Sequence, residues 1–115
     1  MVVTENPEEL VVSTQVLAEF YWTMTRGIAR PLAEDLAAEA VGHLARYRVI
    51  GNDAGLVLSA VAFARAHRLA YWDALIVRAA QVARCDRLLT EDLHDGARYG
   101  DVVVVNPFRE AGATG

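Results

Sequence analysis

Three carboxylates at the ends of predicted elements, Glu19, Asp73 and Asp92, are the residues whose type and spacing point to chemistry. Glu19 lies in the first turns of a helix expected after the apolar strand at residues 10–12, and Asp73 lies in the first turn of a later helix. Asp92 follows the apolar strand expected at residues 87–90. Acidic residues gathered at such ends predict a divalent-metal site.

Taken singly, two of these carboxylates have ordinary explanations. Glu19 falls on the side of its helix away from the apolar stripe, where a Glu is usually just solvated. Asp73 stands where the helix dipole alone favours an acid. Asp92 is different, because open α/β sheets place their ligands at the carboxyl ends of strands, so a functional role is favoured there. The polar side of the first helix also carries Gln15, Trp22 and Arg26.

The chemistry that suits this set is metal-assisted hydrolysis of a phosphodiester. Mg²⁺ and Mn²⁺ prefer oxygen ligands and keep several waters, so a few convergent carboxylates suffice. The metal activates water and neutralises charge on the phosphate, and no nucleophilic side chain is needed. Zinc chemistry and a nucleophilic triad are disfavoured, because suitable spacing is absent from the single cysteine and the scattered histidines, Cys85, His43, His67 and His94.

The elements that must position these residues alternate between helix and strand. Ser13 and Thr14 are cap candidates for the first helix, Pro31 suits the first turn of the next helix, and Asn52 or Asp53 caps a third. Further strands are expected at residues 48–50 and 102–105. This alternation predicts an α/β fold.

Composition supports one domain. A chain of 115 residues that is 54% hydrophobic can bury a single core. One cysteine gives no disulfide framework, which suits the cytoplasm, and the thiol of Cys85 is expected to be buried. The longest uncharged apolar stretch, residues 54–64, is too short to span a bilayer, so no membrane association is expected. The N-terminus lacks the pattern of a secretion signal.

The net charge and the types of basic residue bear on nucleic-acid binding and on two rival α/β classes. A net charge of −4 argues mildly against non-specific nucleic-acid binding, because phosphate affinity comes largely from released counterions. All eleven basic residues are Arg, which can contact phosphate in bidentate fashion. The absence of Lys weakens two rival α/β classes, the P-loop nucleotidases and the response-regulator receivers.

Four stretches carry a family resemblance. VSTQVLAEF at residues 12–20, YWDALI at 71–76, LLTEDL at 88–93 and VVNPF at 104–108 appear in the order and spacing of PIN-domain toxins of the VapC type. The resemblance runs from about Leu10 to Phe108. It implies a PIN-like three-layer α/β sandwich with a mostly parallel sheet.

The resemblance also implies a function. Toxins of this type are Mg²⁺- or Mn²⁺-dependent endoribonucleases that hydrolyse RNA, dimerise, and are held inactive by a cognate antitoxin protein. By position, Glu19, Asp73 and Asp92 match the family's catalytic metal-binding acids. Thr90 matches the hydroxyl residue that supports the last acid, and Asp95 a less regular extra carboxylate, although Asp95 before Gly96 also reads as turn chemistry.

One departure concerns the N-terminus. The family opens with a central strand that ends in a metal-binding Asp, in a sheet of order 3-2-1-4-5, whereas this chain begins MVVTENP. A parallel crossover needs a dozen or more residues, so Met1–Thr4 does not fit that strand, and an oxygen from Glu5 in a hairpin is no better favoured than a flexible end. We therefore expect a truncated single domain over residues 1–109 with the first central strand missing, and a disordered tail at residues 110–115.

The missing strand would affect both the sheet and the function. The strands flanking the gap should pair directly, accept a strand from a second chain, or aggregate. Two functions stand at this point. One is a toxin endoribonuclease impaired by the missing ligand, and the other is a non-catalytic remnant that only binds its antitoxin.

Overall fold

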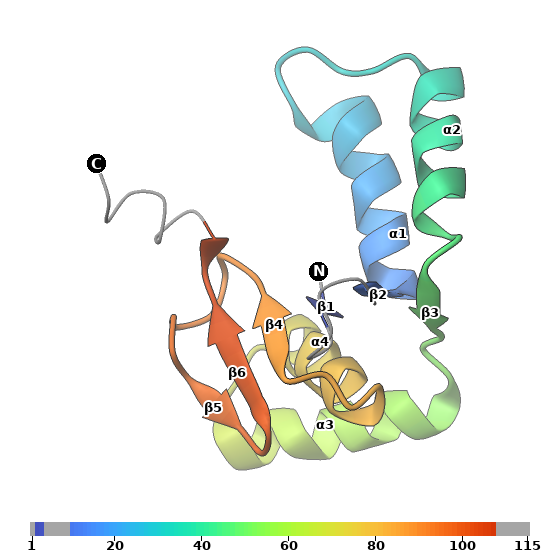
Figure 1. Cartoon of the computed structure of the whole chain (residues 1–115). Helices are drawn as coiled ribbons and strands as arrows, with labels where there is room; N and C mark the ends of the chain where they lie inside the picture. The colour runs from blue at the N-terminus through green and yellow to red at the C-terminus, as the bar shows by residue number, and fades with distance from the viewer. Residues whose placement is uncertain (1, 4–9, 108–115) are drawn as a thin grey trace.

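One mixed sheet organises the computed structural model, which describes residues 2–3 and 10–107 (Figure 1). Within this part of the chain the strand order is β3-β2-β1-β4-β6-β5. The strands are β1 (Val2–Val3), β2 (Leu10–Ser13), β3 (Arg48–Ile50), β4 (Arg87–Leu89), β5 (Arg98–Tyr99) and β6 (Val102–Val105). The helices are α1 (Thr14–Trp22), the π-helix η1 (Thr23–Gly27), α2 (Glu34–Leu44), α3 (Ala54–His67) and α4 (Tyr71–Val82).

The strands that lead to the predicted acids run in the same direction. β2 pairs with β3 in parallel and β4 pairs with β6 in parallel, while β1 is antiparallel to both β2 and β4. β2 and β4 are therefore parallel to each other across β1, and their carboxyl ends share one edge of the sheet. This arrangement confirms the predicted α/β fold.

The centre of the sheet differs from the sequence expectation. We expected no strand between β2 and β4, but β1 lies there, with Val2 opposite both Val11 and Leu88. The prediction that the flanking strands pair directly, or recruit a second chain, is wrong for this structure. A parallel crossover is indeed too long for the sequence between β1 and β2, but an antiparallel connection needs far fewer residues, and two β-branched valines favour a strand. Glu5 lies outside the described residues, as does the tail at residues 110–115.

Side-chain caps fix the starts of two helices. Ser13 Oγ accepts a hydrogen bond from Val16 N at 3.1 Å, and Asp53 Oδ1 accepts one from Leu56 N at 2.8 Å. Both are caps that the sequence predicts. Pro31, however, is not in the first turn of α2, which begins at Glu34 after a bend and an irregular segment. Leu32 N donates instead to the carbonyl of Met24, so the chain closes the turn after η1 before the next helix starts.

Two apolar clusters hold the layers together. The first joins the sheet to α4 and contains Val11, Leu88 and Val102 of the sheet with Val77 of the helix. Cys85 is also buried there, as predicted. The second lies between α3 and α4, where small residues allow close approach, and contains Leu56, Ala60, Leu75 and Ala79. α4 is thus packed on both sides, which gives Asp73 a rigid support.

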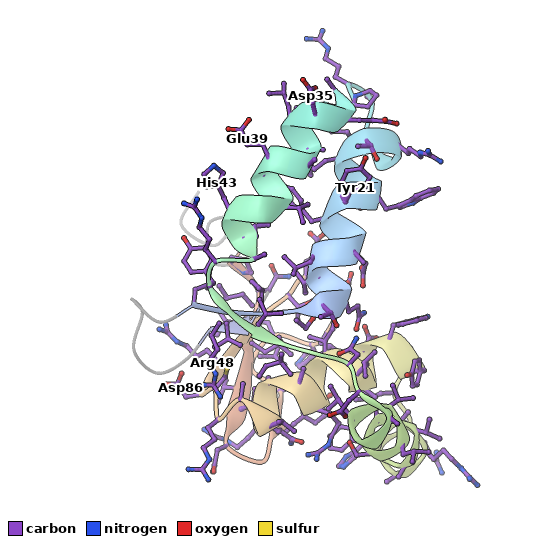
Figure 2. All side chains as sticks on the ribbon, turned by 90° about the vertical axis from the view of Figure 1, so that its right-hand side faces the viewer. Tyr21, Asp35, Glu39, His43, Arg48 and Asp86 are labelled. Atoms are coloured by element: carbon purple, nitrogen blue, oxygen red, sulfur yellow. The ribbon has the colours of Figure 1, made fainter. Side chains whose placement is uncertain are left out.

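α1 and α2 form an arm that extends away from the sheet (Figure 1). Along α2 only Ala37 is buried. Figure 2 shows the side chains of Glu39 and His43 on the side of α2 away from α1, where their oxygen and nitrogen are 4.0 Å apart. The same view places Arg48 and Asp86 in the body of the molecule, below the arm. Within the described residues, none of the helices has the length and apolar character to cross a membrane.

Replacing both valines of β1 by proline tests its place in the sheet. Proline removes backbone donors, so Val2→Pro with Val3→Pro should lower the free energy of unfolding by roughly 2–4 kcal/mol, because each broken bond also leaves a buried partner unsatisfied. Hydrogen exchange should report faster exchange among the amides of the residues opposite β1, which are Leu10, Val11, Arg87 and Leu88. The control Val2→Thr with Val3→Thr keeps the donors and should leave these amides protected. Unchanged exchange in the proline variant would contradict a central β1.

Candidate active site

A cleft of about 700 Å³ lies at the edge of the sheet where β2 and β4 end. Its wall on one side comes from the start of α1, and on the other side from the start of α4. Asn52, which follows β3, and Asp92, which follows β4, complete it. The lining residues are Thr14, Gln15, Ala18, Glu19, Asn52, Trp72, Asp73, Ile76 and Asp92.

The structure brings together the three carboxylates that the sequence singled out. Glu19, Asp73 and Asp92 all line the cleft, although they come from α1, α4 and the loop after β4. Glu19 and Asp92 are exposed, whereas Asp73 is half-buried. Glu19 is held in place by Gln15, whose Nε2 donates to Glu19 Oε1 at 2.7 Å.

Asp73 has the most perturbed environment of the three. Burial raises the pKa of its carboxyl above the ordinary value of 3.8, and the negative charges of Asp92 and then Glu19 raise the pKa further. Asp73 also lies in the first turn of α4, where the helix dipole favours the ionised form. The three acids therefore create a concentrated negative potential that a cation would relieve.

Thr90 lies directly after β4 and contacts the backbone of Asp92. Its hydroxyl oxygen accepts a hydrogen bond from the backbone N–H of Asp92 at 3.2 Å. This bond bends the chain directly after β4 and so directs Asp92 to the cleft. The family role assigned to Thr90 remains a prediction, and this contact is what such a role requires.

Asp95 is not brought to the cleft. Its Oδ1 accepts a hydrogen bond from Asn106 N at 2.8 Å, so it ties the loop after β4 to the end of β6. Gly96 follows with a φ of 85°, a backbone conformation that favours glycine. The geometry thus indicates that Asp95 stabilises a turn. Its predicted role as an extra metal ligand stays a prediction.

Two amide residues of the cleft were not predicted from the sequence as members of the site. Gln15 Oε1 and Asn52 Oδ1 are buried oxygens with no hydrogen-bond partner among the described residues. Gln15 was noted only as a neighbour of Glu19, and Asn52 only as a cap candidate. The signal available was weak, because nothing in the sequence shows that the loop after β3 meets α1. That meeting is made by Asn52 N, which donates to Thr14 Oγ1 at 3.1 Å.

Residues 3–98 match the family model of the PIN domain, which covers most of the chain and all three cleft carboxylates. The chain belongs to the PIN domain family. PIN domains form a superfamily of nucleases that often occur in toxin–antitoxin systems and generally use divalent metal ions. Among curated proteins, none matches this chain.

The cleft of this PIN domain fits a divalent ion by the chemistry of its donors. Three carboxylates line it, and Mg²⁺ or Mn²⁺ prefers oxygen ligands. Two further lining residues, Gln15 and Asn52, each carry a buried amide oxygen with no hydrogen-bond partner among the described residues. In the part of the chain that the structure describes, no three Asp, Glu, His or Cys side chains are positioned to hold one ion together. That is compatible with Mg²⁺, which is usually bound through one or two carboxylates and completes its shell with water.

The raised pKa of Asp73 has a consequence for stability. Because the folded state holds this proton more tightly than the unfolded state, stability should fall as the pH rises from 3.8 through the folded-state pKa. Without metal, Asp73→Asn should therefore raise the free energy of unfolding near neutral pH by up to about 1 kcal/mol, since solvent screens part of the repulsion. The gain should vanish well below pH 3.8.

Urea unfolding at these two pH values measures the effect. Glu91→Gln is the matched control, because Glu91 is exposed, adjacent to Asp92, and absent from the cleft lining. An equal gain from both variants, or a gain from Asp73→Asn that persists at low pH, would contradict the proposed repulsion.

Proposed function

We propose that this PIN domain is a Mg²⁺- or Mn²⁺-dependent endoribonuclease, the toxin of a bacterial toxin–antitoxin pair of the VapC type. The observation that carries the proposal is the convergence of Glu19, Asp73 and Asp92 in one cleft. A half-buried acid whose charge is opposed by two other acids is costly to maintain without a function. The membership of the PIN family supplies the nuclease class.

The residues divide the catalytic work among them. Asp73 and Asp92 would hold the ion, with Glu19 as the third carboxylate. The ion when bound supplies charge neutralisation on the phosphate and acidifies a water molecule. Gln15 orients Glu19 through the bond to its Oε1, and Thr90 orients Asp92 through the backbone. A cation held in the cleft would oppose the burial and the repulsion that raise the pKa of Asp73.

The toxin part of the proposal rests on the VapC-type motifs and on the family's frequent place in toxin–antitoxin systems. PIN domain nucleases commonly bind RNA, bind antitoxins and dimerise. For this chain we propose RNA as substrate, a cognate antitoxin as inhibitor, and a homodimer as the assembled form. The cytoplasm suits these roles, since the sequence has one cysteine, the buried Cys85, and so no disulfide framework.

A second candidate is a non-catalytic domain that only binds its antitoxin. It is favoured by the lack of three described side chains positioned around one ion. The described residues of the central strand, Val2 and Val3, also contribute no carboxylate. Binding of antitoxin without metal-dependent cleavage would support this candidate over the first.

Metal binding gives the first test. Mn²⁺ should bind the purified protein weakly and raise its melting temperature, because the ion relieves the repulsion among the acids. Asp73→Asn combined with Asp92→Asn removes two charges and two oxygen ligands, so both effects should be lost in calorimetric titration and thermal unfolding. Glu91→Gln should behave as wild type. Equal titration curves for wild type and the double variant would remove the site from consideration.

Cleavage gives the second test. The protein should hydrolyse RNA only with Mg²⁺ or Mn²⁺, and single substitution of Asp73→Asn or Asp92→Asn should lower the rate by roughly 100-fold or more, since each removes a ligand that positions the reaction. Gel analysis of a structured RNA measures this, with Glu91→Gln as control. Asp95→Asn keeps an oxygen acceptor for Asn106 and should retain activity. Cleavage that resists chelation, or that survives Asp73→Asn, would exclude the proposed mechanism.

A further inference from the structure

Trp72 is an exposed aromatic residue at the wall of the acidic cleft. Its side chain remains 63% exposed although it is directly followed by Asp73 and lines the same cleft as all three acids. Burial of so large an apolar ring would normally stabilise a fold. An exposed Trp beside a site is therefore a candidate contact for a ligand that has an aromatic face.

We infer that Trp72 is a positioning residue on which an unpaired RNA base stacks, so that the adjoining phosphate is presented to the carboxylates. This inference rests on the proposed ribonuclease function and adds a residue to it. Three features of the cleft support it: the charge balance, the division of its lining, and the way the indole is held.

The charge balance of the cleft favours a contact with RNA that needs no charge. Phosphates are repelled by the three acids, and the whole chain carries a net charge of −4. No Arg is among the described residues that line the cleft, so the usual electrostatic contribution to RNA binding is weak there. Stacking of a base on an aromatic face needs no charge and operates on every base.

The cleft has an apolar side and an acidic side, which suits the base and the phosphate of a nucleotide. Ala18, Trp72 and Ile76 contribute apolar surface, whereas Glu19, Asp73 and Asp92 contribute oxygens. Trp72 and Asp73 are consecutive residues in the first turn of α4. A base on the apolar side and its phosphate on the acidic side would therefore occupy the same cleft.

The indole is held by a fixed neighbour. The rings of Tyr71 and Trp72 have centroids 5.1 Å apart and meet at 69°, an edge-to-face contact. Tyr71 in turn packs against the cluster between α3 and α4, whose buried residues include Leu56 and Leu75. A platform that is already held loses little conformational entropy when a base binds.

The other tryptophan supplies an internal comparison. Trp22 is also exposed, at 59%, but it lies at the end of α1 and is not among the cleft residues. Its ring is covered by the guanidinium of Arg26 at 5.1 Å from the centroid. These two are the only tryptophans in the sequence, so each can be observed alone.

Fluorescence of single-tryptophan proteins tests the inference. Trp22→Phe leaves Trp72 as reporter, and Trp72→Phe leaves Trp22. In an Asp73→Asn background, which prevents cleavage, a short single-stranded oligoribonucleotide with Mg²⁺ should quench Trp72 strongly and Trp22 little. A duplex of the same sequence should quench Trp72 far less, because its bases are already stacked and paired.

Kinetics of otherwise wild-type protein complete the test. Trp72→Ala should raise KM by roughly 10- to 100-fold with a much smaller change in kcat, as expected for loss of one stacked base. Trp72→Phe keeps an aromatic face and should restore KM to near the wild-type value, and Trp22→Ala should have little effect. A rescue by Phe separates stacking from a general loss of structure.

The outcomes separate this inference from the proposed function. Quenching of Trp72 by single-stranded RNA in a protein that never cleaves would uphold the stacking and exclude the nuclease. Metal-dependent cleavage with no selective quenching, and with KM unchanged in Trp72→Ala, would overturn the stacking and uphold the nuclease. Equal quenching of both tryptophans, or equal quenching by duplex, would also overturn it.

Discussion

The hydrogen bonding of β1 between β2 and β4 is the constraint on which the rest of the structure depends. On one side of β1 lie β2 and β3, and on the other lie β4, β6 and β5. Without a strand between them, the facing edges of β2 and β4 would carry unpaired backbone groups beside the buried core, each at a cost of about 1–3 kcal/mol. Its two residues lie opposite Leu10 and Val11 on one side and opposite Arg87 and Leu88 on the other, so β1 joins the two halves of the sheet.

The direction of β1 matters less for the site than its position. β2 and β4 remain parallel to each other whether the strand between them runs with them or against them. Their carboxyl ends therefore reach the same edge of the sheet, where α1 begins and where the turn to Asp92 begins. The cleft and its acids follow from this shared edge, as in open α/β sheets generally.

Electrostatics at the cleft oppose the stability that the sheet provides. Burial, Asp92 and Glu19 all raise the pKa of Asp73, so the fold retains a carboxyl where its charge is disfavoured. The packing of α4 on both sides makes this possible, since the helix cannot easily move to relieve the repulsion. Sites that break the rules of stable packing in this way are commonly functional.

The sequence by itself determined the local elements and the chemical character of the site. The Ser13 and Asp53 caps, the burial of Cys85, the alternation of strand and helix, and the placement of carboxylates at element ends all follow from short-range patterns. The resemblance in four short motifs pointed to the same acids, and family membership is shown by the match over residues 3–98.

Only the tertiary structure decided which segments meet. The antiparallel β1, the delayed start of α2, the contact of Asn52 with Thr14 and the engagement of Asp95 by Asn106 all depend on residues far apart in the chain or on competing backbone hydrogen bonds. Short-range patterns contain no information on such pairings. The strand propensity of Val2 and Val3 indicates only that they prefer an extended backbone. Their direction and their partners are set by the edges of β2 and β4, which the rest of the fold leaves unpaired.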